Sequence, residues 1–530
     1  MPSPIKTSDK TPEPRQIPPT SQSLPGFDTD ALTQWLLAAV VGYAIVRALF
    51  EAATRPFWYD ELCTWVIVRQ GSVSAIWRAL SHVVDGQPPA YYVIERLASV
   101  LTNNEHVSFR IPSILGFSCV IFCLYSFIRK QSGGTVALAC AMIPLFTVLF
   151  DPFAVEARPY SLMVACISIA LVCYQHAPSI RWMILIGASF ALAQSFHYYS
   201  AISFVPFITA EAVLTLSARR IRWPVWLAFS CGLLPLIFFW PLLSRFRNYY
   251  GAHFWAMPSL EGAKSSYGWY FNTTTTWGLI LLVTTVLAVM GTLLLRVRKE
   301  AEVARPAADL LHEPILILGF LGLPLIGFVI AQFAHGGMTP RYMLPTLIGF
   351  SLAAGYVLPR MKRNSVGLIA IFILLSAVAI QEKRFWSSYS AHLISPADSV
   401  EALVASAGHS DLPVVVSDPH DFLQLAHYAS PEWNQRFISL VDPPEALIYS
   451  GSDSADKELQ AMRDFVPLRV YDFDKFAADH TSFLLYSSNA GAGLDWWGGK
   501  LFRSGYSLRM VAQKDYYHRV FLVIKKEATR

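Results

Sequence analysis

Charged side chains are scarce in this sequence. Of its 530 residues 15% are charged and 54% are hydrophobic, whereas about a quarter of a soluble globular protein is charged. The shortage is uneven, because residues 1–381 hold 45 charged residues and a net charge of +9, and residues 382–530 hold 34 and a net charge of −4. This distribution excludes a protein that is soluble throughout. It predicts a lipid-embedded body followed by a soluble C-terminal domain.

Several other features are absent. Residues 382–530 contain no cysteine, and of the seven cysteines in the chain only Cys63 lies outside an apolar run, which excludes a disulfide scaffold. No basic-aromatic motif indicates a nucleic-acid partner, and we expect none. We also expect no cleavable signal peptide. Residues 1–30 are rich in Pro, Ser, Thr and Gln, which predicts a disordered cytoplasmic arm.

Apolar runs are abundant between residues 31 and 381, and about 20 such residues suffice for a membrane-spanning helix. A polar segment, 51–109, separates the first two runs and forms a long outer loop. Its residues 62–80 have an amphipathic pattern that predicts a helix on the membrane surface. We expect eleven spans, at 31–50, 110–128, 134–150, 160–174, 183–196, 200–216, 224–243, 276–295, 314–333, 342–358 and 365–381.

The charges that lie between these spans predict the orientation. With the N-terminal arm in the cytoplasm, every cytoplasmic connection carries Lys or Arg, as the positive-inside rule requires. The short outer loops hold few cations besides Arg158 and Arg341. An odd number of spans then places residues 382–530 outside the cytoplasm. Glu211, near the cytoplasmic end of its span, is expected to be a packing residue.

The polar residues that are hardest to explain by packing gather on the outer side. Taken singly, Asp60 and Glu61 suit a helix start. Arg158 and Arg341 suit contact with lipid headgroups, and His197 suits a helix end. As a set they end otherwise uncharged spans on one side of the membrane, where ionisable groups are functional candidates by default. Other members of the set are His82, Asp85, Glu156, Tyr160 and Tyr342.

Carboxylates beside cations at a membrane boundary suit the transfer of a sugar from a polyprenyl phosphate. Arginine binds the phosphate well, and a carboxylate can act as general base on an acceptor hydroxyl. The leaving phosphate monoester, whose second pKa is about 6, departs without an obligatory general acid. In-line attack would invert the anomeric centre.

The ordered motifs also carry a family resemblance across about residues 30–350. The sequence resembles GT-C-fold glycosyltransferases of the protein O-mannosyltransferase and aminoarabinose transferase (ArnT-like) group. The resemblance implies a polytopic α-helical membrane protein of about eleven transmembrane helices with a C-terminal soluble α/β domain. The matching pieces are Asp60-Glu61, residues 82–92 with Gln-Pro-Pro-Ala-Tyr-Tyr at their end, residues 156–162, His197-Tyr198-Tyr199 and residues 340–345.

The resemblance implies roles for these residues in transfer from a polyprenyl-phosphate sugar on the outer face. Asp60 would be the general base, and Glu61 and Asp85 would orient the acceptor or, in some relatives, a divalent metal ion. Arg158 and Arg341 would bind the phosphate. The pattern departs at Ala90, where an aliphatic residue is usual, which affects packing. Residues assigned with the arginines to substrate binding are His82, Glu156, Tyr160, His197 and Tyr342.

The sequence leaves the metal and the acceptor open. Several of these groups are hard ligands, but none has the spacing of a zinc motif, and a phosphate leaving group does not require a metal. We therefore expect no obligatory cofactor, with a divalent metal ion as the alternative. The acceptor is a glycan, a lipid or a protein. A transporter or flippase of lipid-linked sugars would place its polar groups near the bilayer midplane, and an oligosaccharide ligase or polymerase is a third reading.

The C-terminal part has the alternating pattern of a mixed α/β domain. It contains no glycine-rich nucleotide-binding motif. Acceptor recognition is one role for it, and a passive cap over the active site is the role we favour. Strands are expected at 413–417, 437–441, 465–471, 482–487, 508–512 and 517–524, with a helix at 420–429.

Overall fold

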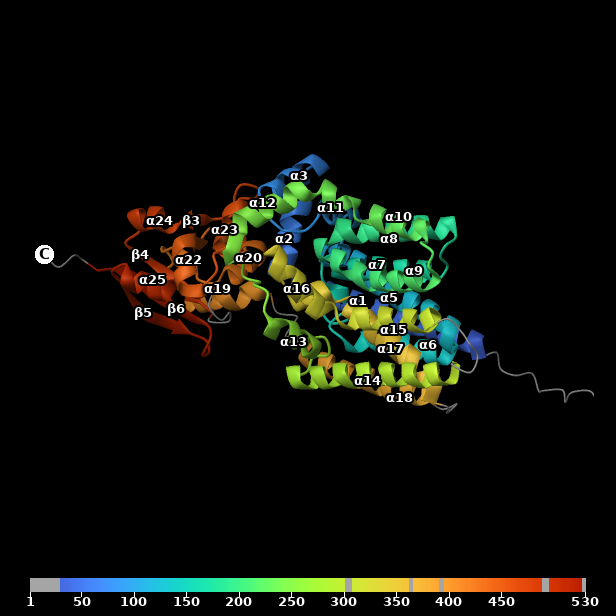
Figure 1. The fold of residues 1–530 in the computed structure, drawn as a ribbon. Helices are drawn as coiled ribbons and strands as arrows, with labels where there is room; N and C mark the ends of the chain where they lie inside the picture. Colours follow the sequence, from blue (N-terminus) through green and yellow to red (C-terminus); the bar gives the residue numbers. More distant parts are fainter. Residues whose placement is uncertain (1–28, 301–306, 362–365, 390–394, 489–494, 527–530) are drawn as a thin grey trace, which may run out of the picture.

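The computed structural model describes residues 29–300, 307–361, 366–389, 395–488 and 495–526. They form an elongated molecule in which a helical body and a mixed α/β domain lie end to end (Figure 1). The body comprises α1 to α18, and the C-terminal domain begins at α19 (Pro396–Ser406). The predicted fold class, a polytopic helical body with a C-terminal α/β domain, is therefore confirmed in its main features.

A helix occupies each of the eleven apolar segments expected from the sequence. Length and composition qualify four described helices as spans, or up to six when two bent pairs each count as one. The number eleven and the orientation therefore stay predictions. The helices in these segments are α1 (Thr29–Thr54), α5 (Glu105–Ser132), α6 (Gly134–Ala141), α7 (Tyr160–Tyr174), α8 (Ile180–Phe196), α9 (Phe204–Ala218), α10 (Trp223–Gly232), α14 (Thr275–Glu300), α15 (Ala307–Leu321), α17 (Thr346–Val357) and α18 (Val366–Ser388).

Proline explains why two of the expected spans are bent. The first bend, of 53°, separates α10 and α11 (Leu234–Phe238) from α12 (Trp240–Tyr250), and the second, of 63°, separates α15 from α16 (Leu323–Ala334). The helix after each bend has a proline at its first or second position. Proline lacks an amide N–H and suits a helix start, so each continuous apolar run is divided into separate helices.

The segment 51–109, predicted to be a long outer loop, contains three complete helices: α2 (Tyr59–Val68), α3 (Val73–Ser81) and α4 (Pro89–Ala98). The predicted single surface helix at 62–80 is wrong, because the chain turns between α2 and α3 and most of α2 is buried. The amphipathic pattern arose from two elements with different neighbours. Only α3 keeps an exposed side beside a buried one.

The C-terminal domain is a six-stranded sheet in the order β3-β2-β1-β4-β6-β5. The first four of these are parallel neighbours, and β6 and β5 add antiparallel pairs at one edge. Val414 and Val416 of β1 pack in one core and Val415 in another, so both faces of the sheet are covered. The strands are β1 (Val414–Val416), β2 (Phe437–Val441), β3 (Val470–Asp472), β4 (Ser482–Ser487), β5 (Tyr506–Gln513) and β6 (Arg519–Lys525).

The predicted strands and the predicted helix of this domain are found, with one correction. The helix at 420–429 is α20 (Pro419–Tyr428). The expected strand at 465–471 is wrong over most of its length, since β3 begins only at Val470. Pro467 lies within the expected strand and cannot donate a ladder hydrogen bond.

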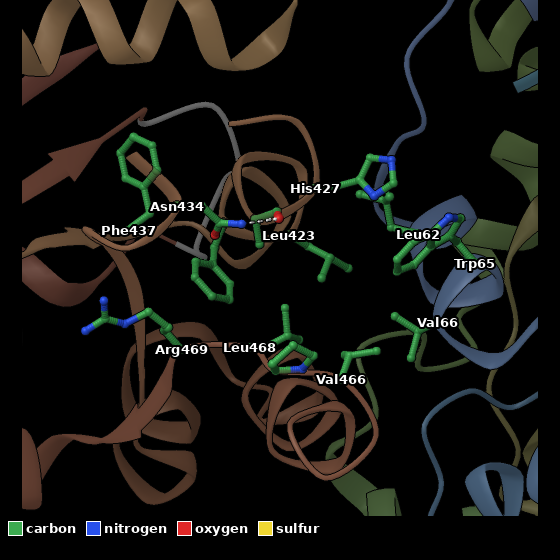
Figure 2. Close-up of a pocket in the computed structure, with 13 residues that line it drawn as sticks. Leu62, Trp65, Val66, Leu423, His427, Asn434, Phe437, Val466, Leu468 and Arg469 are labelled. Carbon is green, nitrogen blue, oxygen red and sulfur yellow. Dashed lines mark hydrogen bonds between the residues drawn. The ribbon is translucent and has the colours of Figure 1, made fainter. Parts of the chain in front are cut away.

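The C-terminal domain is fixed to the outer segment of the body. The Tyr428 hydroxyl accepts a hydrogen bond from the Phe57 N–H at 2.6 Å, and the Gln424 amide donates to the Phe57 carbonyl at 2.9 Å. Between α2 and this domain lies a cavity of about 280 Å³, into which Trp65 and Val66 point from one side and His427 and Leu468 from the other (Figure 2). The contact is therefore made by a few specific polar bonds around an incompletely filled apolar gap.

On the opposite end of the body, Glu211 is fully buried, as expected of a packing residue. Its carboxylate accepts hydrogen bonds at 2.8 Å from the Tyr174 hydroxyl and from Nε of Arg222. Tyr174 and Arg222 thus compensate the Glu211 charge within the helix bundle, and none of the predicted site residues takes part.

Candidate functional site

A larger cavity, of about 570 Å³, opens where the body meets the C-terminal domain. Its walls come from α2, the turn after α3, the loop before α7, the 3-10 helix Tyr198–Ser203, α12, α16, the 3-10 helix Pro340–Met343 and one helix of the C-terminal domain. Six predicted site residues lie in these walls: Asp60, Asp85, Arg158, His197, Arg341 and Tyr342. Residues from distant parts of the sequence thus converge on one cavity.

Two carboxylate–arginine pairs form the polar end of this cavity. Nη1 of Arg341 lies 2.5 Å from Oδ2 of Asp60, and Nη1 of Arg158 lies 2.6 Å from Oδ2 of Asp85. Nε of Arg158 is also 3.9 Å from Asp60, so the pairs form one network. The Gly86 N–H donates to Asp85 at 2.6 Å and holds that carboxylate in place. A Cβ at Gly86 would lie 2.5 Å from the Phe246 ring, so any other residue here would require that ring to move.

The network determines the charge on Asp60. Burial acts to raise the pKa of this carboxyl, but the charges of Arg341 and Arg158 outweigh burial, and the pKa is lowered from its ordinary value. Asp60 is therefore ionised near neutral pH. While Arg341 is bound to it, however, it is a weak base.

His197 offers a neutral hydrogen-bond donor to the same cavity. Burial and the nearby charges of Arg158 and Arg341 lower its pKa to about 3. Its Nδ1 accepts a hydrogen bond from the Tyr199 N–H at 3.2 Å, which places the proton on Nε2. Nε2 has no hydrogen-bond partner among the described residues. A buried donor without a partner is suited to a ligand oxygen.

Aromatic rings hold the Arg341 guanidinium and the His197 imidazole in position. Tyr342 stacks on Tyr199 with ring centroids 4.7 Å apart and lies 4.9 Å from the His197 ring. Tyr160 does not line the cavity, but its ring lies 5.8 Å from the Arg341 guanidinium and 5.5 Å from His197. Cation–π contact of this kind fixes the orientation of a guanidinium.

Glu61 lies behind the cavity wall. It is fully buried, and its two carboxylate oxygens accept hydrogen bonds from Nε and Nη2 of Arg110 at 2.8 and 2.7 Å. The Ala157 N–H donates a third bond at 2.8 Å. Arg110 also donates to the carbonyls of Ala52, Arg55 and Pro56. The Glu61–Arg110 pair therefore ties α2 to α5 and to the start of the outer segment.

Glu156 and His82 also lie outside the cavity walls. Glu156 is buried, and its Oε1 lies 3.4 Å from Arg55. Burial is the main cause that raises its pKa to about 7. His82 is exposed at the end of α3, with its ring edge-on to Phe465 at 5.5 Å. Among the described residues, no group of three or more His, Cys, Asp or Glu side chains is arranged to hold a metal ion.

The remaining walls contain residues that the sequence motifs did not identify. One wall comes from the helices after the two bends, α12 and α16. Its apolar part is formed by Trp240, Leu243, Ile330 and Ala334, and α12 also contributes the polar residues Ser244, Arg247 and Asn248. The opposite wall belongs to α23 (Ser454–Met462) of the C-terminal domain, which contributes Glu458. Apolar residues in a span and a lone carboxylate in a soluble domain carry no sequence signal of a site.

Part of the chain matches a known protein family. Residues 86–244 match the family described as dolichyl-phosphate-mannose-protein mannosyltransferase, a stretch that includes Asp85's neighbour Gly86 as well as Arg158 and His197. A search of curated proteins found no match.

Two solved structures of ArnT from Cupriavidus metallidurans share the fold over nearly the whole chain. The apo structure matches with a TM-score of 0.55 and 15% identity, covering 93% of this chain and 98% of that one. The structure bound to undecaprenyl phosphate matches with a TM-score of 0.52 and 15% identity, covering 92% and 98%. The resemblance inferred from the motifs is confirmed, and the chain has the GT-C fold of these proteins.

Proposed function

We propose that this protein is a membrane glycosyltransferase that moves a monosaccharide from a polyprenyl-phosphate donor to an acceptor hydroxyl on the outer face of the membrane. One observation carries the proposal: the Asp60–Arg341 and Asp85–Arg158 pairs lie together in a cavity whose neighbouring wall is partly apolar. A polyprenyl-phosphate sugar has the complementary parts, since it joins a lipid chain to a phosphate and a sugar. The ArnT structure with bound undecaprenyl phosphate supports the choice of donor.

The donor phosphate would bind to Arg158 and Arg341, with the neutral His197 donating from Nε2. Guanidinium groups bind phosphate oxygens through paired, charge-assisted hydrogen bonds. The apolar residues of α12 and α16 would hold the first isoprene units. Each buried CH₂ group contributes about 0.8 kcal/mol, so a few units add substantially to affinity.

Donor binding would also prepare the base. A phosphate that engages Arg341 competes with Asp60 for the same guanidinium, and losing that partner raises the pKa of the Asp60 carboxyl. Asp60 then accepts the proton of the acceptor hydroxyl as this oxygen attacks the anomeric carbon. The bond to the phosphate oxygen breaks, the polyprenyl phosphate leaves, and attack from the opposite side inverts the anomeric centre.

The carboxylates and arginines of the cavity lie at the ends of helices, next to the C-terminal domain. This position favours transfer over transport, because flippases and other transporters hold their polar groups near the middle of broken helices. Sugar and acceptor identities follow from the shape of the cavity and are matters for assay.

Purified protein in detergent provides the direct test. With a radiolabelled undecaprenyl-phosphate monosaccharide and extracted cell-envelope lipids, glycans or peptides as acceptors, we expect label to move to an acceptor and undecaprenyl phosphate to be released. Asp60→Asn should abolish transfer without loss of expression or membrane insertion. A transporter would leave the donor intact in detergent, and full activity of Asp60→Asn would remove Asp60 as the base.

A further inference from the structure

One helix of the C-terminal domain, α23, forms part of the wall of the transferase cavity. Of the described residues in this domain, Ser454 and Glu458 line the cavity, one helical turn apart. A domain that merely covers the site would present backbone or inert side chains. Here it presents a carboxyl group.

Glu458 lies against the turn of α2 that carries Asp60. The Tyr59 hydroxyl donates to its Oε2 at 2.9 Å, and the Cys63 thiol donates to its Oε1 at 3.2 Å. Tyr59 directly precedes Asp60 and Cys63 follows it by three positions, so the Glu458 carboxyl spans the same turn. Its position in the cavity is thus defined relative to the proposed base.

Contacts that do not involve Glu458 hold α23 in place. Nζ of Lys457 donates to the Tyr249 carbonyl at 2.8 Å, and the Tyr249 hydroxyl donates to the Lys457 carbonyl at 3.1 Å. The Trp255 N–H donates to Oγ of Ser454 at 3.2 Å. Removing the carboxyl of Glu458 therefore leaves the helix attached to α12 and to the loop that follows it.

The charge balance around Glu458 differs from that of the other two cavity carboxylates. Asp60 and Asp85 each have an arginine partner, whereas Glu458 forms no ion pair within the described parts of the chain. Burial, followed by the charges of Asp85 and Asp60, raises its pKa to about 7. The His420 imidazole, edge-on to Tyr59 at 4.4 Å, also interacts with the Glu458 charge, but it is paired with Asp418 at 3.1 Å. Without an ion pair of its own, the Glu458 carboxyl can accept a hydrogen bond from a ligand.

We propose that Glu458 is a positioning residue for the acceptor, and that the C-terminal domain forms the acceptor-facing wall of the site. The Glu458 carboxyl accepts a hydrogen bond from a hydroxyl or an ammonium group of a saccharide acceptor. That contact turns a neighbouring hydroxyl of the acceptor towards Asp60. The donor occupies the arginine and apolar walls, so the acceptor approaches from α23. This inference rests on the proposed transferase function.

The test measures KM for donor and acceptor separately. Full-length protein in detergent is assayed with an undecaprenyl-phosphate monosaccharide as donor and methyl glycosides of glucose and glucosamine as acceptors. In Glu458→Ala, the acceptor KM should rise about tenfold or more, because a hydrogen bond to a charged or polar partner is lost. The donor KM should stay within about twofold.

Two matched variants separate positioning from folding. Glu458→Gln keeps the shape and an accepting oxygen, so a hydroxyl contact leaves the acceptor KM nearly unchanged, while an ammonium contact raises the KM for the glucosamine glycoside alone. Lys457→Ala weakens the attachment of α23 but leaves the cavity wall, and its acceptor KM should match the wild type. For the glucose glycoside, which has no titrating group of its own, the acceptor KM of the wild type should change more between pH 6 and 8 than that of Glu458→Gln, in which the other titrating neighbours, Glu156 and His420, are retained.

The outcomes distinguish this inference from the function it rests on. If the wild type does not turn over the donor, the proposed function is contradicted, and the inference with it. If the donor is turned over but Glu458→Ala leaves the acceptor KM unchanged, only the inference is overturned. An equal rise of both KM values in Glu458→Ala and Lys457→Ala, or failure of both glycosides to accept sugar from a donor that is hydrolysed, would also overturn it.

Discussion

Replacing Glu61 by glutamine should destabilise the protein and leave its chemistry largely intact. Glu61 and Arg110 are both fully buried and share two hydrogen bonds of 2.7 and 2.8 Å. Removing one charge of a buried pair leaves the other without compensation and costs about 3–5 kcal/mol. Against a total stability of about 5–15 kcal/mol for a folded domain, this is a large loss. We expect a clear fall in the unfolding temperature and in the yield of folded protein.

Asp60→Asn should instead slow the transfer reaction strongly and change the stability of the protein little. Asp60 lines the cavity, where a charged Arg341 left without its partner still reaches solvent, so the cost in stability is small. A general base contributes about 10²–10⁴-fold to the rate. At about 1.36 kcal/mol for each factor of ten, its loss raises the activation barrier by about 3–5 kcal/mol.

The comparison requires stability and rate to be measured on the same preparations. Size-exclusion chromatography after heating gives the unfolding temperature in detergent, and transfer per folded molecule gives the rate constant. Glu61→Gln at normal unfolding temperature with a rate reduced a hundredfold would refute this reasoning. That result would instead support the acceptor-orienting role of Glu61 that the family resemblance implies.

Three further predictions concern the donor, the domain contact and pH. Arg158→Ala should raise the donor KM about tenfold or more, because it removes a charge-assisted contact to phosphate, and an unchanged donor KM measured by titration would exclude Arg158 from phosphate binding. Tyr428→Phe should loosen the C-terminal domain by about 1 kcal/mol for the lost hydrogen bonds to Phe57 and His106, seen as faster proteolysis between body and domain; unaltered digestion would show that other contacts suffice. Glu458 has a pKa of about 7 in the folded state, above its ordinary value of 4.5, so the folded state binds the proton more tightly and stability should fall as pH rises from about 4.5 to about 7. Thermal unfolding of Glu458→Gln should show a smaller slope, and equal slopes would contradict the assignment.

The sequence predicted the fold where a single helix or strand carries the pattern. Apolar runs located the body helices, and short β-rich runs located β2 and β4 at their observed bounds. Failures came from neighbours that are distant in sequence. The pattern at 62–80 joined two helices, since nothing local reveals that the C-terminal domain buries α2.

The site was predicted in part for the same reason. Asp60, Asp85, Arg158 and Arg341 were identified because charges are conspicuous at the ends of apolar runs. Successive helical residues are about 100° apart, so adjacent carboxylates on α2 face different surroundings. Asp60 faces the cavity and Glu61 faces the core. The sequence does not reveal this choice, because it depends on Arg110, which looks like an ordinary boundary charge at the start of a span.

Glu458 lay beyond prediction because its role depends on docking between two parts of the chain. Nothing in its sequence neighbourhood differs from an ordinary solvated helix. The attachment of α23 to Tyr249 and Trp255 and the contacts of Glu458 with Tyr59 and Cys63 bring it to the cavity. A similar limit applies to the apolar wall, where Trp240 and Ile330 are typical of any membrane span.

The two bent helix pairs give the cavity an unobstructed side. Its lining residues Trp240 and Ile330 are 55% and 39% exposed, and the apolar surface continues outward over Phe238 and Phe333, which are 67% and 83% exposed. The cavity lining therefore merges with the outer hydrocarbon-compatible surface of α11, α12 and α16. A long isoprenoid chain with its phosphate inside can trail into the bilayer along this path without crossing water. Loading and release of such a molecule would then require sideways diffusion in the lipid and no large opening of the fold.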